Sequence, residues 1–347
     1  MVTLKDIAAK AGVSTATVSY VINNTGNIGS ETRKKVLDVM NELDYKPNHV
    51  ARSLKVKRTR TIGVIVEDIT IFNSPEIIDG INSYAEKYGF SILLTNLRIF
   101  KRIGNKFNEM DKCKDLIESA VNELISKQVD GIIYIGVHVR DVTKLVPKNH
   151  DKPIIYTYCY TTSETDYTVN FEDQLATYEM TKYLIELGHR KLALITGLND
   201  SFLTHQRFAG YNRALVENQL LLNPVYIKTG DWEYESGYKL GLELLQLKDK
   251  PTAIIAMNDL MAGGVLEACR ELKVNVPDDI SVVGFDDREC ALYYLPQLTT
   301  IRLPLSKMGE QSMKKMVDIL NNKREIENIS RLKCELIKRN SVAANKG

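Results

Sequence analysis

From residue 61 onward, short apolar runs alternate with segments whose apolar residues repeat at helical spacing. Such runs are typical of buried strands, and strands that alternate with helices form parallel sheets with helical crossovers. The runs are 62–66, 90–95, 131–135, 154–158, 192–196, 225–228, 253–257 and 280–285. Four precede residue 162 and four follow it. The pattern predicts an α/β fold with two doubly wound parallel-sheet subdomains, and a small ligand in the cleft at their strand ends.

The segment 3–23 predicts two short helices joined by a tight turn. Thr3 is expected to cap the first helix, with Asp6 completing a capping box. Gly12 allows a sharp exit, and Ser14 is expected to cap the second helix. This layout is typical of a helix-turn-helix, whose second helix enters the major groove of DNA.

A third helix is expected to begin after a Ser30 cap and to end before Pro47. Its apolar face would consist of Val36, Leu37, Met40 and Leu43. This face would close the core of a small N-terminal head.

The charge distribution supports a DNA-binding head. The whole chain has a net charge of only +2. Residues 1–60, however, hold eleven Lys and Arg against five Asp and Glu, a net +6, and the remainder holds 35 against 39, a net −4. The basic charge therefore coincides with the predicted helix-turn-helix, as phosphate contacts require.

Several function classes find no support in the sequence. The five cysteines form no CxxC pair, and no apolar run reaches the length of a membrane span. The N-terminus has no signal-peptide pattern, so we expect a cytoplasmic protein with no membrane partner. The chain contains no GxGxxG after a strand, no GxxxxGK[ST], no GxSxG and no HExxH, and its histidines are scattered. We therefore expect no enzyme activity, cofactor or metal.

Further ordered motifs extend over essentially the whole chain. They are Pro47–Leu54, Leu187–Lys191, Arg207–Tyr211, Asn258–Asp259, Asp279–Asp287 and Pro296–Ile301. Together with the head, they resemble the lactose-repressor/galactose-repressor family of bacterial transcription regulators. The resemblance implies a helix-turn-helix DNA-binding head and a periplasmic-binding-protein-like core, in which residues 300–320 return the chain to the first subdomain.

On this basis we expect a DNA-binding domain over 1–47, a hinge helix and linker over 48–60, and an effector-binding and dimerisation core over 61–341. The first subdomain would span about 61–161 and 292–325, and the second about 162–291 and 326–341. The polar segment Arg98–Asp111 is expected to be a solvated loop.

The resemblance also assigns residues to DNA contact. Thr15, Ala16 and Tyr20 occupy the positions that reach base edges. Many relatives carry Arg where this chain has Tyr20, so their operator preference does not transfer to this chain. The alternative to a base contact is that the Tyr20 ring packs on the face of its own helix. The full expected set is Thr3, Lys5, Ser14, Thr15, Ala16, Thr17, Ser19, Tyr20, Asn23, Asn48, Ala51, Arg52 and Leu54.

Leu54 lies in a basic segment too short to form a stable helix alone. In the family the matching leucine wedges into the minor groove and kinks the duplex, and Ala51 would let two such hinge helices pack closely. The alternative is that Leu54 docks on the core. Two-fold readout of a near-palindromic operator then implies a homodimer.

For the effector, the resemblance points to Arg207, Trp232, Asn258 and Asp286, with Asn73 and Ser74 as weaker candidates. A tryptophan ring can stack on a sugar face, while the polar groups bond hydroxyls. Each also has a structural alternative: a surface ion pair for Arg207, a helix cap for Asn258 and a turn for Asp286. Asn73 and Ser74 differ from the aromatic pair of purine-binding relatives, which favours a sugar over a purine.

The expected function is a repressor whose two subdomains change their closure when ligand binds, which moves the dimer surface of the first subdomain. Whether ligand releases or promotes DNA binding stays open. An extracytoplasmic sugar-binding receptor is the alternative, because such receptors share the core but lack the basic head.

Overall fold

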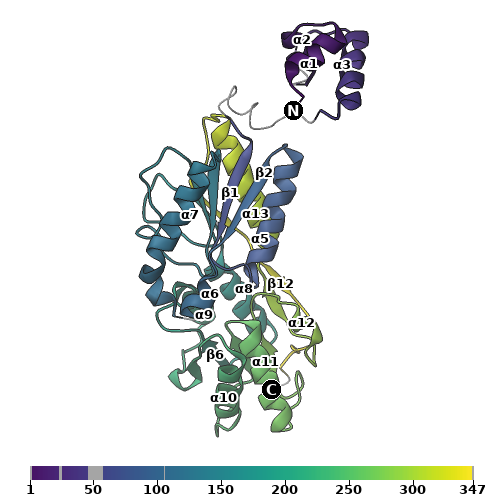
Figure 1. Ribbon diagram of the computed structural model, residues 1–347. Helices are drawn as coiled ribbons and strands as arrows, with labels where there is room; N and C mark the ends of the chain where they lie inside the picture. Colours follow the sequence, from purple (N-terminus) through teal and green to yellow (C-terminus); the bar gives the residue numbers. More distant parts are fainter. Residues whose placement is uncertain (1, 23–25, 46–57, 105, 346–347) are drawn as a thin grey trace. The chain divides into compact units, whose positions relative to one another are not determined.

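The computed structural model describes residues 2–22, 26–45, 58–104 and 106–345. The chain divides into two units, Met1–Thr59 and Arg60–Gly347, which we call the head and the core (Figure 1). Five positions assigned above to DNA contact lie outside the described residues: Asn23, Asn48, Ala51, Arg52 and Leu54.

The head contains three helices, α1 (Leu4–Ala11), α2 (Thr15–Ile22) and α3 (Ser30–Glu42). The predicted caps are confirmed: Thr3 and Asp6 form a capping box, and the Thr17 N–H donates to the Ser14 hydroxyl at 3.0 Å. Gly12 has the left-handed φ of 63° that the turn requires. The buried residues are Ile7, Ala8, Ala11, Val18, Val21, Val36, Val39 and Met40.

Two expectations for α3 are wrong. Ser30 is its first residue, and Gly29 occupies the cap position without a side-chain hydrogen bond. Leu37 is 43% exposed, and Val39 is buried instead. On a helix of 3.6 residues per turn, Val36, Val39 and Met40 form the tighter apolar face.

The first lobe of the core is built on a six-stranded sheet with the order β11-β5-β4-β3-β1-β2, all of whose pairings are parallel. Its strands are β1 (Thr61–Val66), β2 (Ser91–Asn96), β3 (Gly131–Ile135), β4 (Ile154–Thr157), β5 (Tyr167–Phe171) and β11 (Ile329–Leu332). Its longer helices are α5 (Asn73–Lys87), α7 (Lys114–Ser126) and α13 (Leu305–Leu320). Helices α5 and α13 lie side by side on one face of the sheet, and α7 lies on the opposite face (Figure 1).

The second lobe has a four-stranded parallel sheet with the order β7-β6-β8-β9. Its strands are β6 (Leu192–Thr196), β7 (Ile227–Thr229), β8 (Ala253–Ala256) and β9 (Ser281–Val283). Its helices are α8 (Asp173–Glu186), α9 (Phe202–Glu217), α10 (Tyr234–Leu245), α11 (Asp259–Glu271) and the short α12 (Cys290–Tyr293), with a 3₁₀ turn at Pro224–Tyr226. The predicted doubly wound α/β architecture is therefore present in both lobes.

The chain crosses between the lobes after β5, after β10 (Thr300–Arg302) and before β12 (Glu335–Ile337). Strands β10 and β12 pair antiparallel, and the Glu172 N–H donates to the Leu332 carbonyl at 2.9 Å. Backbone hydrogen bonds thus link all three crossings.

The observed crossings place the subdomain boundaries at other residues than the sequence predicted. Strands β5 and β11 belong to the first sheet, although the expected first subdomain ended at residues 161 and 325. Residues 292–302 belong with the second lobe, because bridges join Thr299 to Val283 and Arg302 to Asp286. β5 was missed because its sequence, Tyr-Thr-Val-Asn-Phe, alternates in polarity and so does not form an apolar run.

The segment Arg98–Asp111 is not the solvated loop that was expected. It forms the short helix α6 (Ile99–Ile103) and part of a 3₁₀ helix over Phe107–Cys113. Ile99 is fully buried and Met110 is 4% exposed, so two apolar side chains anchor this polar segment to the first lobe.

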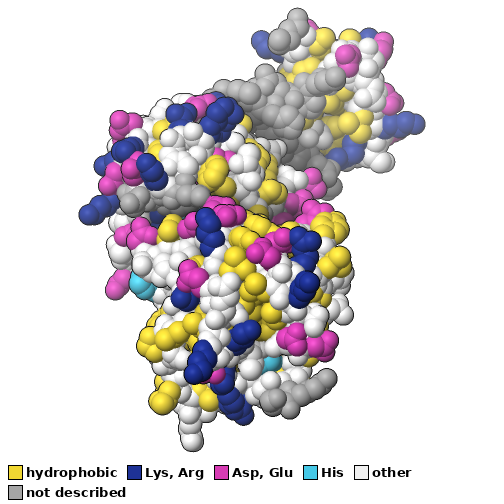
Figure 2. Space-filling view, turned by 90° about the horizontal axis from the view of Figure 1, so that it is seen from below, with side chains coloured by type: hydrophobic (Ala, Val, Ile, Leu, Met, Phe, Trp, Pro, Cys, Tyr) yellow, Lys and Arg dark blue, Asp and Glu magenta, His cyan; other side chains and the backbone are white. Residues whose placement is uncertain are grey.

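The surface of the core carries charges of both signs, interspersed with apolar side chains (Figure 2). Within the described residues, no helix is long and apolar enough to cross a membrane. The same residues contain no group of three His, Cys, Asp or Glu side chains placed to hold a metal ion.

Candidate ligand pocket and DNA-reading helix

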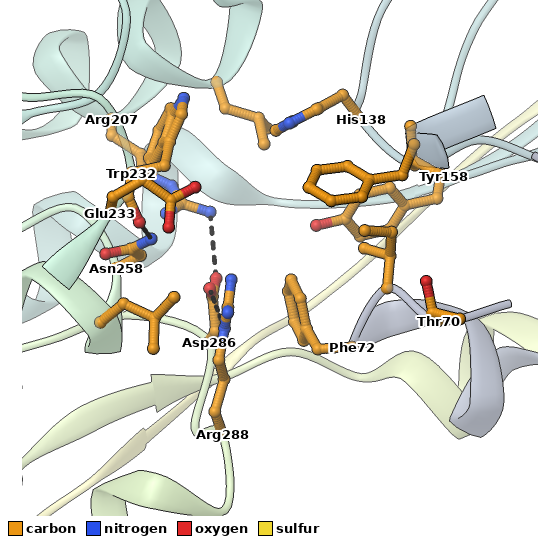
Figure 3. Close-up of a pocket in the computed structure, with 15 residues that line it drawn as sticks. Thr70, Phe72, His138, Tyr158, Arg207, Trp232, Glu233, Asn258, Asp286 and Arg288 are labelled. Atoms are coloured by element: carbon orange, nitrogen blue, oxygen red, sulfur yellow. Dashed lines mark hydrogen bonds and ion pairs between the residues drawn. The ribbon is translucent and has the colours of Figure 1, made fainter. Parts of the chain in front are cut away.

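A pocket of about 320 Å³ lies between the two lobes of the core; we call it the interlobe pocket (Figure 3). Its lining residues follow the carboxyl ends of strands in both sheets, the usual ligand position in parallel α/β folds. The first lobe contributes Thr70, Ile71, Phe72, Phe100, Val137, His138 and Tyr158. The second lobe contributes Leu203, Arg207, Trp232, Glu233, Asn258, Leu260, Asp286 and Arg288. All four principal candidates from the sequence are therefore in one pocket.

Arg207 organises the wall of the second lobe. It is 1% exposed, so it is not the surface ion pair that was the alternative. Its Nε donates to Asp173 Oδ1 at 3.0 Å, one Nη donates to the Met257 carbonyl, and the other lies 3.6 Å from Asp286 Oδ1. Its Cζ lies 3.6 Å from the centroid of the Phe285 ring. These contacts fix the guanidinium plane, because a buried charge is tolerated only when it is paired.

The charge states of the pocket follow from burial. Burial raises the pKa of Asp173 to about 6 despite the neighbouring Arg207, and burial also raises the pKa of Asp286. Burial lowers the pKa of His138 to about 3, with Arg140 and Arg207 acting in the same direction. At neutral pH the His138 imidazole is therefore uncharged, and it offers one donor and one acceptor.

Trp232 occupies its place because Gly197 has no side chain. A Cβ atom at Gly197 would lie 1.9 Å from the indole ring. The ring centroid lies 6.4 Å from that of His138, across the pocket. The indole N–H is buried and has no hydrogen-bond partner among the described residues, and such an unpaired donor is costly.

Three residues that line the pocket have a positive φ, namely Tyr158 (57°), Trp232 (76°) and Asp286 (110°). This region is unfavourable for residues with a side chain, at about 1–3 kcal/mol each. Such conformations cluster at functional sites, where the surroundings hold them in place.

Asn258 has the role of a helix cap as well as a place in the lining. Its Oδ1 accepts from the Met261 N–H at 2.8 Å, and its Nδ2 donates to the Trp232 carbonyl at 2.7 Å. Both polar ends of the amide already have partners, so Asn258 holds the Trp232 loop against the start of α11.

Asn73 and Ser74 do not line the pocket. Both are fully buried: the Asn73 amide donates to the Gly136 carbonyl at 3.1 Å and the Ser74 hydroxyl to the Asp68 carbonyl at 2.8 Å. The expectation that they contact the ligand finds no support in the lining of the interlobe pocket, because the first turn of α5 directs both side chains into the lobe. They therefore give no information about a purine or a sugar. Phe72 lines the pocket instead.

Sequence reasoning missed the aromatic wall of the first lobe: Phe72, Phe100, His138 and Tyr158. Tyr158 directly follows β4, and His138 comes shortly after β3, which ends at Ile135, so their position after a strand was a usable signal. Phe72 and Phe100 resemble core residues in the sequence. Arg288 was also missed; its Cζ lies 4.0 Å from the Phe72 ring centroid, a contact that joins the two lobes.

In the head, α2 presents the side chains expected to reach DNA. Thr15, Ala16 and Tyr20 are exposed, and Tyr20 is 49% exposed. Ser14 and Thr3 are also exposed, although their hydroxyls take part in caps. Lys5 is exposed, whereas Thr17 and Ser19 are partly buried. The helix thus has a buried face, Val18 and Val21, and an opposite face of small polar side chains with one aromatic ring.

Comparisons with known proteins agree with this architecture. Residues 3–48 match the bacterial regulatory proteins of the lacI family, and residues 181–342 match the periplasmic binding protein-like domain. The chain is 33% identical over 343 residues to the HTH-type transcriptional repressor PurR of Photobacterium profundum, with 99% of each chain covered.

Two solved structures cover nearly the whole chain. The Lac repressor dimer bound to operator and the anti-inducer ONPF has a TM-score of 0.79 and 30% identity, with 99% of each chain covered. The complex of the transcriptional regulator CelR with cellobiose has a TM-score of 0.67 and 27% identity, covering 98% of this chain and 100% of that one.

A helix-turn-helix head joined to a two-lobed core with a ligand pocket defines a ligand-responsive transcription regulator. The chain belongs to the lacI family of bacterial regulatory proteins. It is a DNA-binding transcriptional repressor with an effector-binding domain and not an enzyme, so the alternative of a sugar-binding receptor is wrong.

Proposed function

We propose that the effector of this repressor is a small carbohydrate that binds in the interlobe pocket. The observation that carries the proposal is the pairing of a fixed charge network, centred on Arg207 and Asp286, with the indole of Trp232 in one pocket. A sugar needs planar donors and acceptors for its hydroxyls and an aromatic face for its C–H groups. The cellobiose complex of CelR adds support from a relative of similar fold.

A planar nucleobase is the second candidate. The specific observation in its favour is that five aromatic rings line the pocket, those of Phe72, Phe100, His138, Tyr158 and Trp232. Such rings stack on heterocycles as well as on sugars.

The test is a thermal-shift screen of the full chain with mono- and disaccharides in one arm and nucleobases and nucleosides in the other. A ligand that binds the folded state raises Tm by mass action. Hits are then titrated by calorimetry against the wild type and Trp232→Ala. Sugar hits that Trp232→Ala weakens support the proposal; nucleobase hits alone, or sugar hits that Trp232→Ala leaves unchanged, contradict it.

For DNA, we propose that α2 reads base edges through Thr15, Ala16 and Tyr20, with Thr17 and Ser19 flanking them and Lys5 near phosphate. Their exposure opposite the buried face of α2 supports this assignment. Asn23, Asn48, Ala51, Arg52 and Leu54 are proposed contacts on the basis of the family resemblance alone.

Selection of operator sequences from a random pool, followed by gel-shift titration, tests the assignment. Tyr20→Ala should weaken the selected palindrome by about 1–3 kcal/mol and relax preference at one base position. Lys5→Ala should weaken all sequences alike and reduce the salt slope by about one. Leu54→Ala should weaken operator binding strongly while the folded core stays intact, because the wedge that kinks the duplex is lost. Equal affinity of all three variants and the wild type would contradict the assignment.

We further propose that the repressor acts as a cytoplasmic homodimer. Five large apolar side chains of the second lobe are more than half exposed, which supports a partner surface there. They are Val216 (66%), Leu221 (94%), Val225 (53%), Tyr293 (70%) and Leu295 (90%). Sedimentation of the wild type and of the double variant Leu221→Lys/Leu295→Lys tests this proposal. If the wild type is a monomer, or if the double variant is still a dimer, the proposed surface is contradicted.

A further inference from the structure

A second cavity of about 610 Å³ opens beside the lobe crossings, and its lining differs from that of the interlobe pocket; we call it the side cavity. Strands β5 and β11 form one wall, and the start of α8 with one face of α9 forms the other. The lining residues used below are Tyr160, Asn170, Phe202, Gln206, Arg213 and Arg331.

The side cavity contains polar groups that the described chain leaves unused. The Asn170 amide donates to the Cys159 carbonyl at 2.9 Å, but its Oδ1 is buried without a partner. Arg331 faces Asn170 across the β11–β5 register. Among the described residues, the side chains of Arg331 and Gln206 form no hydrogen bond or ion pair. Unpaired buried polar atoms are costly, and native proteins usually satisfy them with water or ligand.

The two cavities share a wall. Asp173 lines the side cavity, while Arg207, bonded to it at 3.0 Å, lines the interlobe pocket. Leu203 lines both cavities. A molecule in the side cavity would therefore contact the back of the ion pair that organises the interlobe pocket.

We propose that the side cavity is a second effector site for a small anionic polyol, such as a sugar phosphate or a sugar acid. Arg331 and Arg213 line the cavity from opposite lobes and would receive the anionic group. The Arg213 Nε donates to Glu217 at 2.8 Å and its Cζ lies 4.5 Å from the centroid of the Tyr178 ring, so its Nη groups would be the donors to the anion. Asn170 and Gln206 bond hydroxyls. The rings of Tyr160 and Phe202, 5.0 Å apart between centroids, cover the apolar face.

Such a ligand touches both lobes, so it favours one closure of the core over others. Because the Asp173–Arg207 pair lies between the sites, occupancy of one changes the affinity of the other, and the effect is reciprocal. The inference does not depend on which compound fills the interlobe pocket.

Calorimetry on the full chain tests the site with four probes: ribose 5-phosphate and gluconate, and ribose and glucose as their neutral counterparts. In the Trp232→Ala variant, where binding in the interlobe pocket is removed, we expect at least one anionic probe to bind and its neutral counterpart not to bind. Arg331→Gln should weaken that probe by about tenfold or more, as expected for a lost charge-assisted contact. The matched control is Arg324→Gln, which makes the same change at an exposed arginine outside the lining and should leave affinity unchanged.

A Trp232→Ala variant separates this proposal from the carbohydrate proposal. Binding of the anionic probe should survive Trp232→Ala, whereas binding in the interlobe pocket should not. The side-cavity proposal is overturned if no anionic probe binds, if Arg331→Gln binds it as tightly as the wild type, or if Trp232→Ala abolishes its binding. Unchanged circular dichroism and Tm of each ligand-free variant verify that it is folded.

Discussion

The two walls of the interlobe pocket differ in their chemistry. The second lobe supplies a charged wall, in which Arg207 is held by Asp173 and Asp286 inside its own lobe. The first lobe supplies an aromatic wall with an uncharged His138. The charged wall is preorganised without the other lobe, whereas the aromatic wall offers surfaces that gain contacts when the lobes close. We infer that the second lobe orients a ligand and that the first lobe responds to it.

The largest expected effect is on the charged wall. Arg207→Met leaves the buried Asp173 carboxylate without its ionic partner, whereas Asp286 keeps its ion pair with Arg288 at 3.2 Å. The change should lower the free energy of unfolding by about 3–5 kcal/mol. Arg213→Met is the matched control on the same helix, because Arg213 is 53% exposed in its pair with Glu217 and should cost less than about 1 kcal/mol. Urea denaturation measures both variants. Equal stability of Arg207→Met and the wild type would show that the ion network does not hold this wall.

The next effect concerns the position of Trp232. Gly197→Ala places a methyl group against the indole and should displace it, which weakens a ligand of the interlobe pocket by about thirtyfold. Isothermal titration with the hit from the screen measures the change. The double variant with Trp232→Ala should bind no worse than Trp232→Ala alone, since the clash is then absent. Additive losses would contradict this mechanism.

A smaller effect distinguishes two adjacent residues of the first lobe. Phe72→Ala should weaken ligand binding by about tenfold through loss of an aromatic surface. Asn73→Ala should lower stability through the lost bond to the Gly136 carbonyl but leave ligand affinity unchanged. The same titration serves both variants, and the reverse pattern would restore the assignment made from sequence.

The smallest effect is the response of His138 to pH. Its pKa falls from 6.5 when unfolded to about 3 when folded. The folded state thus resists protonation, so the stabilisation is present above pH 6.5 and is lost as pH falls toward 3. When the pH falls from 7.5 to 5.5, protonation of this histidine in the unfolded state should lower the free energy of unfolding of the wild type by about 1 kcal/mol. The His138→Gln variant should not show this loss. Denaturation at both pH values measures the difference, and parallel pH dependence of the two proteins would contradict it.

The contrast between the walls also explains what the sequence could predict. Arg207, Trp232 and Asp286 could be assigned because the family resemblance pointed to them, and Trp232 and Asp286 also lie just after strands β7 and β9. Phenylalanine is usually a core residue, so only the fold shows that Phe72 and Phe100 face a cavity. The register of the first turn of α5 decides between Phe72 and Asn73, and helix boundaries are uncertain by one or two residues in sequence reasoning.

Within the fold, strands with continuous apolar runs were predictable, as for β3 and β6. Two neighbouring strands at one end of the first sheet were not: β5 alternates in polarity, and the edge strand β11 is short, with one buried residue. The placement of such strands depends on pairing with distant segments, which local periodicity does not contain.

The hydrogen-bonded crossings give the core one further property. Glu172 is tied to Leu332, and β12, which follows, is paired with β10, so none of the three connections can bend alone. Any change in the angle between the lobes must therefore bend the three connections together. One donor–acceptor dye pair attached across the pocket mouth would then report the state of the whole core, whichever molecule changes it.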